Sequence, residues 1–157
     1  MALVHEMMYH NQDFSRMNMR HYIENLVNYL KTIYHLRPDR TTLSVMCENV
    51  YLNLNQALPC GMLISELVSN AIKHAFPRNR TGSVKVKLER RLSWTRLSVS
   101  DNGAAFPDDR PPDQFTTLGL VIVRDLVKQM NGTLEIFKQD DFKIFQIDFK
   151  TEANSGT

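Results

Sequence analysis

Apolar residues recur at three- and four-residue spacing in three segments of the chain, which predicts three amphipathic helices. The segments are residues 18–34, 55–76 and 118–130. We place Pro59 in the first turn of the second helix, where a missing backbone N–H is tolerated. The Asn131-Gly132 pair follows the third segment and is a typical helix end.

Other segments alternate apolar and polar residues, which predicts strands. Residues 41–54 are rich in β-branched side chains and form one strand or two short ones. A hairpin with a two-residue turn and a second hairpin around an acidic turn account for the remaining alternating segments, which are residues 83–91, 94–100, 133–138 and 142–149.

The order of these elements predicts an α/β two-layer sandwich with one mixed sheet and about three helices packed on a single face. The strands from Ser83 onward keep polar residues at alternate positions, as expected of a sheet with one face in solvent. Residues 101–117 show no periodicity and are expected to form a long loop, and loops of this length are usually functional or mobile.

Composition narrows the class of protein. The 157 residues fit one domain, and the net charge of +2 gives no reason to expect a nucleic-acid partner. No apolar run is long enough to span a membrane, and no signal-peptide pattern opens the chain. Cys47 and Cys60 lack metal-ligand spacing, so we expect reduced thiols in a cytoplasmic domain.

The second predicted helix carries a polar stripe beside its apolar face. Glu66, Asn70, Lys73 and His74 lie within about a third of a turn of one another at roughly 100° per residue. A carboxylate and an amide one turn apart suit Mg²⁺, and a lysine one turn further on suits a phosphate. Taken alone, the stripe is more typical of an ordinary solvated helix face.

Two further stretches carry candidate chemistry. Asp101 follows a predicted strand and precedes Gly103, so its carboxylate can accept a hydrogen bond from an amine while the glycine admits a flat ring. Thr116, Thr117 and Gly119 open the third helix, whose free N–H groups favour phosphate. The alternatives are a common Asp-Asn-Gly turn and an ordinary glycine at a helix start.

Three stretches, taken together and in this order, resemble a known family. They are ELVSNAIKHAFP, LSVSDNG with a following FP, and TLGLVIVRDLVKQMNGTLEI. The chain is similar to the catalytic ATP-binding (Bergerat-fold) domain of sensor histidine kinases, in a subgroup with a short lid. The resemblance covers nearly the whole chain. A gyrase- or MutL-type ATPase is disfavoured because no transducer domain with a catalytic lysine follows.

The resemblance implies a role for each matching position. Asn70 coordinates Mg²⁺ between the ATP phosphates, and Glu66 orients a metal-bound water or acts as a base. Asp101 binds the adenine amino group and thereby selects adenine over guanine. The other implied ATP-binding positions are Lys73, His74, Gly103, Ala105, Phe106, Thr117, Leu118, Gly119 and Leu120.

The resemblance also implies an activity that needs a second domain. ATP is held with its γ-phosphate outward for attack by a histidine of a dimerisation domain, and a response regulator is the next partner. Residues 1–16 match the end of that domain's helix with a linker, residues 17–150 the ATP-binding domain, and residues 151–157 a disordered tail. His5 and His10 lack the sequence context of a phosphate acceptor.

Two positions depart from the family pattern. Ala105 replaces the second glycine of an Asp-x-Gly-x-Gly loop, and Lys143 stands where a threonine helps to hold adenine. These departures leave open a second hypothesis, in which a degenerate nucleotide-binding fold works as a regulatory or protein-interaction module.

Overall fold

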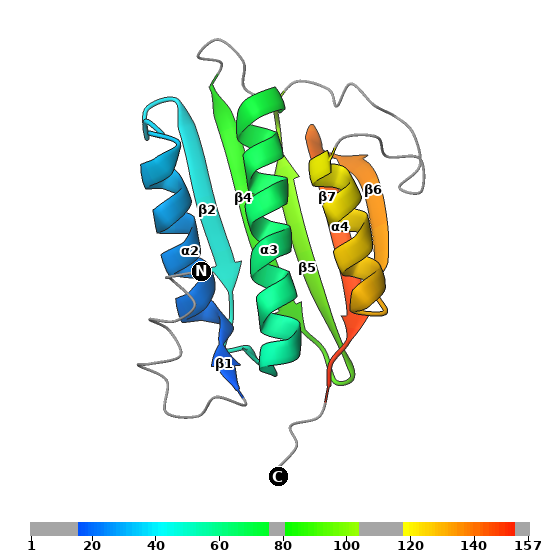
Figure 1. The fold of residues 1–157 in the computed structure, drawn as a ribbon. Helices are drawn as coiled ribbons and strands as arrows, with labels where there is room; N and C mark the ends of the chain where they lie inside the picture. The colour runs from blue at the N-terminus through cyan, green and yellow to red at the C-terminus, as the bar shows by residue number, and fades with distance from the viewer. Residues whose placement is uncertain (1–15, 76–80, 104–117, 153–157) are drawn as a thin grey trace.

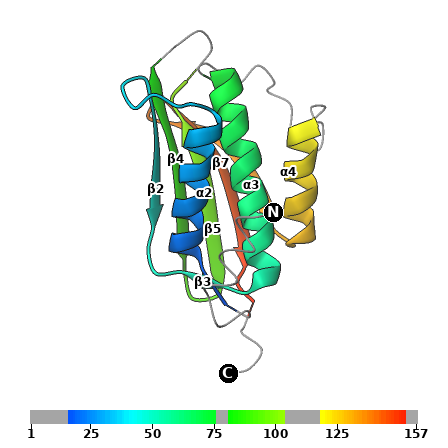
Figure 2. The ribbon, with the colours of Figure 1, turned by 60° about the vertical axis from the view of Figure 1, so that its left-hand side comes forward.

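Three helices lie on one face of a five-stranded sheet in the computed structural model, which describes residues 16–75, 81–103 and 118–152 (Figure 1). The helices are α2 (Met19–Ile33), α3 (Leu54–Asn70) and α4 (Leu118–Gln129). A view turned by 60° separates the two layers (Figure 2). The predicted two-layer sandwich is therefore confirmed.

The sheet is mixed, with the strand order β2-β4-β5-β7-β6. Strands β2 and β4 are parallel, and each of the other neighbouring pairs is antiparallel. The strands span β2 Thr41–Cys47, β4 Gly82–Arg90, β5 Trp94–Asp101, β6 Thr133–Gln139 and β7 Phe142–Lys150. The β4–β5 hairpin has three connecting residues, one more than predicted, because β4 ends at Arg90.

A second, two-stranded sheet lies beside the start of α2. It pairs β1 (Met17–Asn18) with β3 (Tyr51–Leu52) in antiparallel register. The side chain of Asn18 also caps α2 by accepting a hydrogen bond from the His21 N–H at 3.3 Å. One strand or two short ones were predicted over residues 41–54. The structure has two strands there, β2 and β3, with a break after Cys47.

The core fills the space between the helices and the sheet. Alternate residues of β5 are buried, so that one side of the strand faces the helices and the other side does not. Tyr22 and Ile23 of α2 are fully buried, as are Leu63 and Ile64 of α3. Burying a side chain of this size stabilises the fold by about 1.5–3 kcal/mol, so this core is the main source of stability.

Helix α3 begins one residue earlier than predicted, and this changes the position of Pro59. Asn53 caps the helix by accepting a hydrogen bond from the Asn55 N–H at 3.0 Å. Pro59 consequently lies in the second turn, and the prediction of a first-turn proline was wrong. The proline cannot donate to the carbonyl of Asn55, the i−4 partner in an α-helix. A π-helical segment, η1 (Ala71–Ala75), continues α3 directly.

The carboxyl end of β7 is fixed to the start of α3. Gln56 is 4% exposed, and its amide donates to the carbonyl of Lys150 at 2.7 Å while accepting from the N–H of Glu152 at 3.0 Å. The Thr151 hydroxyl lies 2.6 Å from that of Thr95. Thr151 and Glu152, which the sequence places in the tail, are thus held against the domain, and residues 153–157 lie outside the described residues.

Candidate nucleotide site

Four segments meet at one end of the molecule (Figure 1). They are the carboxyl ends of α3 and β5, the amino end of α4, and the turn between β6 and β7. The sequence motifs predicted to bind a nucleotide lie on the first three of these segments, although they are far apart along the chain.

Glu66, Asn70 and Gly119 are direct neighbours. A Cβ atom built on Gly119 would lie 3.0 Å from Glu66 Oε2 and 3.5 Å from Asn70 Oδ1. The missing side chain therefore lets the first turn of α4 approach both polar groups of α3. The N–H groups in the first turn of an α-helix have no carbonyl partner within the helix, so the start of α4 favours a negatively charged ligand at this end.

The side-chain amide of Asn70 is unsatisfied among the residues that the structure describes. Its nitrogen is buried and has no hydrogen-bond partner there. A buried amide without a partner is rare in folded proteins and commonly marks a place for a ligand, ion or water. Together with the Glu66 carboxylate one turn away, the amide oxygen gives two hard oxygen donors, which fit Mg²⁺ because this ion takes its remaining ligands from water and phosphate.

Lys73 does not join this group. Its ammonium lies 5.9 Å from the centre of the Tyr34 ring, at the end of α2. Tyr34 in turn shares a hydrogen bond of 2.7 Å with Ser69. Lys73, in the η1 segment that continues α3, therefore lies on the side facing α2, whereas Glu66 and Asn70 of α3 face α4. The π-helical turn changes the rotation per residue after Asn70, which the regular 100° spacing does not anticipate.

Asp101 is buried at the end of β5, with 3% exposure. Its Oδ1 accepts a hydrogen bond from the Gly103 N–H at 3.1 Å, and its Oδ2 lies 3.7 Å from Lys143 Nζ on β7. Burial raises the pKa of Asp101 above its ordinary value, and Lys143 and the Gly103 N–H oppose that rise. Burial also lowers the pKa of Lys143, against the attraction of Asp101. The sequence identified Lys143 only as a departure from a family pattern.

The remaining predicted positions divide into two groups. Leu118 is 76% exposed at the start of α4, whereas Leu120 is buried in the core and contributes through packing. The predictions for Ala105, Phe106, Thr117 and the side chain of His74 lie outside the described residues. The role of each predicted position as a nucleotide contact stays a prediction.

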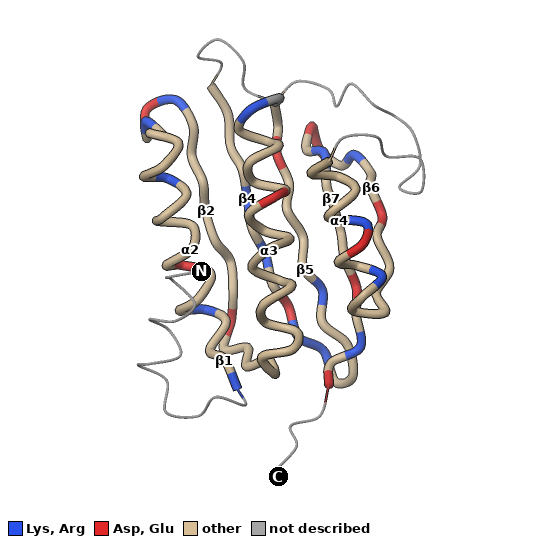
Figure 3. Tube along the Cα trace, in the orientation of Figure 1, with Lys and Arg blue, Asp and Glu red and all other residues tan. Residues whose placement is uncertain are grey.

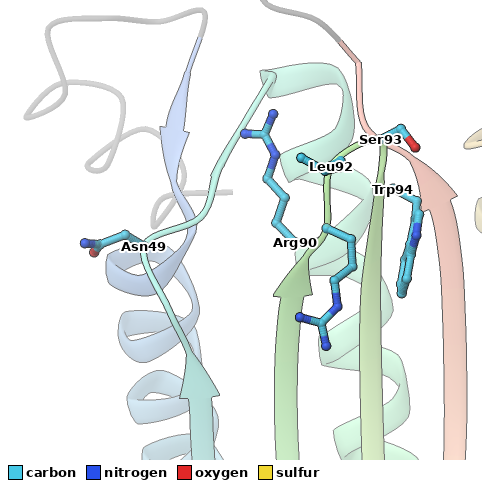
Figure 4. Close-up of a pocket in the computed structure, with 6 residues that line it drawn as sticks. Asn49, Arg90, Leu92, Ser93 and Trp94 are labelled. Atoms are coloured by element: carbon cyan, nitrogen blue, oxygen red, sulfur yellow. The ribbon is translucent and has the colours of Figure 1, made fainter.

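Two cavities lie elsewhere on the described part of the chain. One has a volume of about 840 Å³ and is lined by the β4–β5 hairpin, including Arg90 and Trp94, together with Asn49 (Figure 4). The other, of about 450 Å³, lies on the sheet face that the helices leave uncovered, with Lys85 and Gln146 in its lining. Basic and acidic residues are mixed over the described elements (Figure 3).

Family models match two parts of the chain. Residues 55–157 match the family described as histidine kinase-, DNA gyrase B- and HSP90-like ATPase. Residues 1–34 match the family described as histidine kinase. In the described part of the chain, no helix combines the length and apolar character needed to cross a bilayer.

Two curated relatives are histidine kinases by name. The sensor histidine kinase PdtaS of Mycobacterium tuberculosis is 40% identical over 85 residues, which are 53% of this chain and 17% of that protein. The blue-light-activated histidine kinase 2 of Erythrobacter litoralis is 29% identical over 106 residues, or 67% of this chain and 31% of that protein. The chain thus spans less than a third of either relative.

Solved structures agree on the fold. The blue-light activated histidine kinase of Erythrobacter litoralis superposes with a TM-score of 0.82 at 24% identity, over 96% of this chain and 51% of that one. The histidine kinase ThkA in complex with the response regulator protein TrrA gives 0.65 at 18% identity, over 96% and 47%. The chain belongs to the histidine kinase-, DNA gyrase B- and HSP90-like ATPase family, and the relatives and solved structures described above, to which it is similar, are histidine kinases.

Proposed function

We propose that this domain binds ATP with Mg²⁺ between α3, β5 and α4 and presents the γ-phosphate to a histidine of a separate dimerisation domain. The observation that supports this most strongly is the contact of Gly119 with Glu66 and Asn70, because it joins two of the three motifs in one place. The buried Asp101 carboxylate at the same end of the molecule supplies a hydrogen-bond acceptor for the adenine amine.

Each residue has a separate task in this proposal. Asn70 and Glu66 hold the metal and its water, and the start of α4 at Gly119 binds the phosphates through backbone N–H groups. Asp101 fixes the base. When bound, Mg²⁺ would neutralise part of the negative charge of the phosphates. Phosphoryl transfer depends mainly on positioning and electrostatic stabilisation, so a site made of such binding groups is sufficient for this half of the reaction.

The partners in this proposal are other protein domains. The histidine that accepts the phosphate belongs to the dimerisation domain, for which the histidine kinase match over residues 1–34 gives support. A response regulator then takes the phosphoryl group, as the structure of ThkA with its response regulator protein suggests by analogy. Both events take place on the cytoplasmic side of the cell.

A second candidate is a degenerate fold that regulates without turning over ATP. The Lys143–Asp101 contact favours it, because the carboxylate expected to bind adenine already has a charged partner. Replacing Ala105 by Gly and Lys143 by Thr separates the two candidates. A large gain in ATP affinity indicates degeneration, and no gain indicates an intact site.

The proposed function is tested by calorimetric titration with a non-hydrolysable ATP analogue and Mg²⁺. We expect saturable binding that weakens at least tenfold in Asn70→Ala and on removal of Mg²⁺. Asn28→Ala, the same substitution on the exposed side of α2, is the matched control and leaves binding unchanged. Absence of saturable binding up to millimolar nucleotide contradicts the proposal.

A further inference from the structure

Lys143 and Asp101 form a buried pair of opposite charges at the position proposed for the base. The two residues are direct partners in the antiparallel register of β5 and β7. Their charged atoms are 3.7 Å apart, and their side chains are only 11% and 4% exposed. Both side chains lie on the sheet face that the helices cover, since Val99 and Phe145, two residues away on each strand, are buried in the core.

Each member of the pair favours the ionised form of the other in a buried place that favours the neutral forms. Burial is the largest influence on the pKa of either residue, raising that of Asp101 and lowering that of Lys143, and each partner's charge opposes it. As the ion pair that the 3.7 Å distance indicates, the two groups present a carboxylate that only accepts hydrogen bonds beside an ammonium that only donates them.

Such a pair matches one edge of a purine. Adenine has an exocyclic amine, which donates, next to ring nitrogen N1, which accepts. Guanine has the opposite order, with an acceptor oxygen next to an N–H donor. A ring placed with its exocyclic group on Asp101 therefore meets two favourable contacts if it is adenine and two repulsive ones if it is guanine.

We propose that Lys143 is a specificity-determining residue of the base subsite, donating a hydrogen bond to N1 of adenine while Asp101 accepts from the amine. This inference rests on the proposed function, because it assumes an adenine nucleotide at this end of the molecule. It assigns Lys143 a contact with ligand, whereas a simple counter-ion would touch only Asp101.

The experiment is a thermodynamic cycle in which the Lys143 side chain and the N1 atom of the ligand are changed singly and together, and the affinities are compared. The wild-type chain and Lys143→Met are each titrated with Mg²⁺ and either ATP or 1-deaza-ATP, which carries C–H in place of N1. We expect wild type to bind 1-deaza-ATP roughly tenfold more weakly than ATP, since one specific base contact is worth about a factor of ten or more. Lys143→Met binds ATP correspondingly more weakly and no longer distinguishes the two nucleotides.

Two controls keep the outcome specific. The ligand 7-deaza-ATP keeps N1 and changes the opposite edge, so its affinity relative to ATP is the same in both proteins. Lys143→Met also reduces the preference for ATP over GTP. Thermal melting verifies that the variant is folded, and Lys143→Leu, which also lacks a hydrogen-bond donor, serves if methionine prevents folding.

The outcomes separate the inference from the function on which it rests. A 1-deaza penalty of equal size in wild type and variant overturns the inference, as does tighter ATP binding by Lys143→Met, which marks the lysine as a competitor for Asp101. A wild-type chain that binds no adenine nucleotide overturns the proposed function, and the inference with it.

Discussion

Gly119 shows how a single residue decides how closely two helices approach each other. The closest heavy atom to a Cβ at this position is Glu66 Oε2, followed by the two side-chain atoms of Asn70. The motif spacing in the sequence suggests that these residues meet, but only the fold gives the distance. The separation of Lys73 from the group could not be predicted, because it depends on the π-helical turn and on Tyr34 of another helix.

Gly119→Ala separates binding from stability. The added methyl group enters the space beside Glu66 and Asn70, so we expect the affinity for Mg²⁺-ATP to fall at least tenfold. The glycine lies in helix α4, where alanine is favoured over glycine by about 1 kcal/mol, so the melting temperature should not fall. Calorimetric titration and a thermal melt on the same sample measure both effects. Unchanged affinity would show that the space next to Gly119 is not used by the nucleotide.

Tyr22 is a second residue whose environment leads to a measurable consequence. Its side chain is fully buried, and its hydroxyl has no hydrogen-bond partner in the part of the chain that the structure describes. Burial, with a smaller contribution from Cys60, raises the pKa of Tyr22 to about 12. A Cβ on Gly61 would overlap the hydroxyl oxygen, so the tyrosine occupies space that this glycine leaves open.

Tyr22→Phe tests this account of the core. Losing an unsatisfied hydroxyl should leave the free energy of unfolding at pH 7 unchanged or raise it by up to about 1 kcal/mol. The unfolded phenol ionises near pH 10 and the folded one near 12. Raising the pH from 10 to 12 therefore ionises Tyr22 first in the unfolded chain, which lowers the free energy of unfolding of the wild type relative to its value below pH 10. Chemical denaturation should show a shallower alkaline decline in the variant. Equal declines in both proteins would contradict the raised pKa.

At the scale of elements, the long helices and strands could be predicted from their periodicity. The features that could not be predicted depend on contacts between segments. The β1–β3 sheet was not predicted, because two-residue strands are too short to show alternation and form only through pairing. Parallel pairing of β2 with β4 likewise depends on the α3 crossover between them. The start of α3 depends on which of several neighbouring polar residues caps it, and the cap is Asn53.

The turn between β6 and β7 carries backbone strain that can be removed. Asp140 and Asp141 have φ values of 51° and 67°, and they are the two residues between the strands. Positive φ at both positions is the geometry of a type I′ turn, for which Asn-Gly is the preferred pair. Replacing them together by Asn and Gly should raise the free energy of unfolding by about 1 kcal/mol. Urea denaturation measures the change, and a decrease would show that the aspartates make contacts that offset the strain.

At the scale of the whole molecule, the fold brings together segments that are separated by tens of residues in the chain. The mixed sheet places the carboxyl end of β5 and the turn before β7 at the end where α3 finishes and α4 begins (Figure 1). The fold class was predictable because every long element has a clear period. The family resemblance places Asp101 and Lys143 near the same base, but their direct contact could not be predicted, since it depends on the register of two strands that are about 40 residues apart.

The central claim is that Asn70, Asp101 and Gly119 surround one adenine nucleotide. The most direct measurement is an NMR titration of the isotope-labelled chain with Mg²⁺-ADP, followed through backbone amide shifts. The account predicts saturable shifts concentrated at Asn70, Asp101, Gly103 and Gly119, with a single dissociation constant. Shifts concentrated instead at the hairpin of Arg90 and Trp94 or on the uncovered face of the sheet, or no saturable shifts, would contradict it.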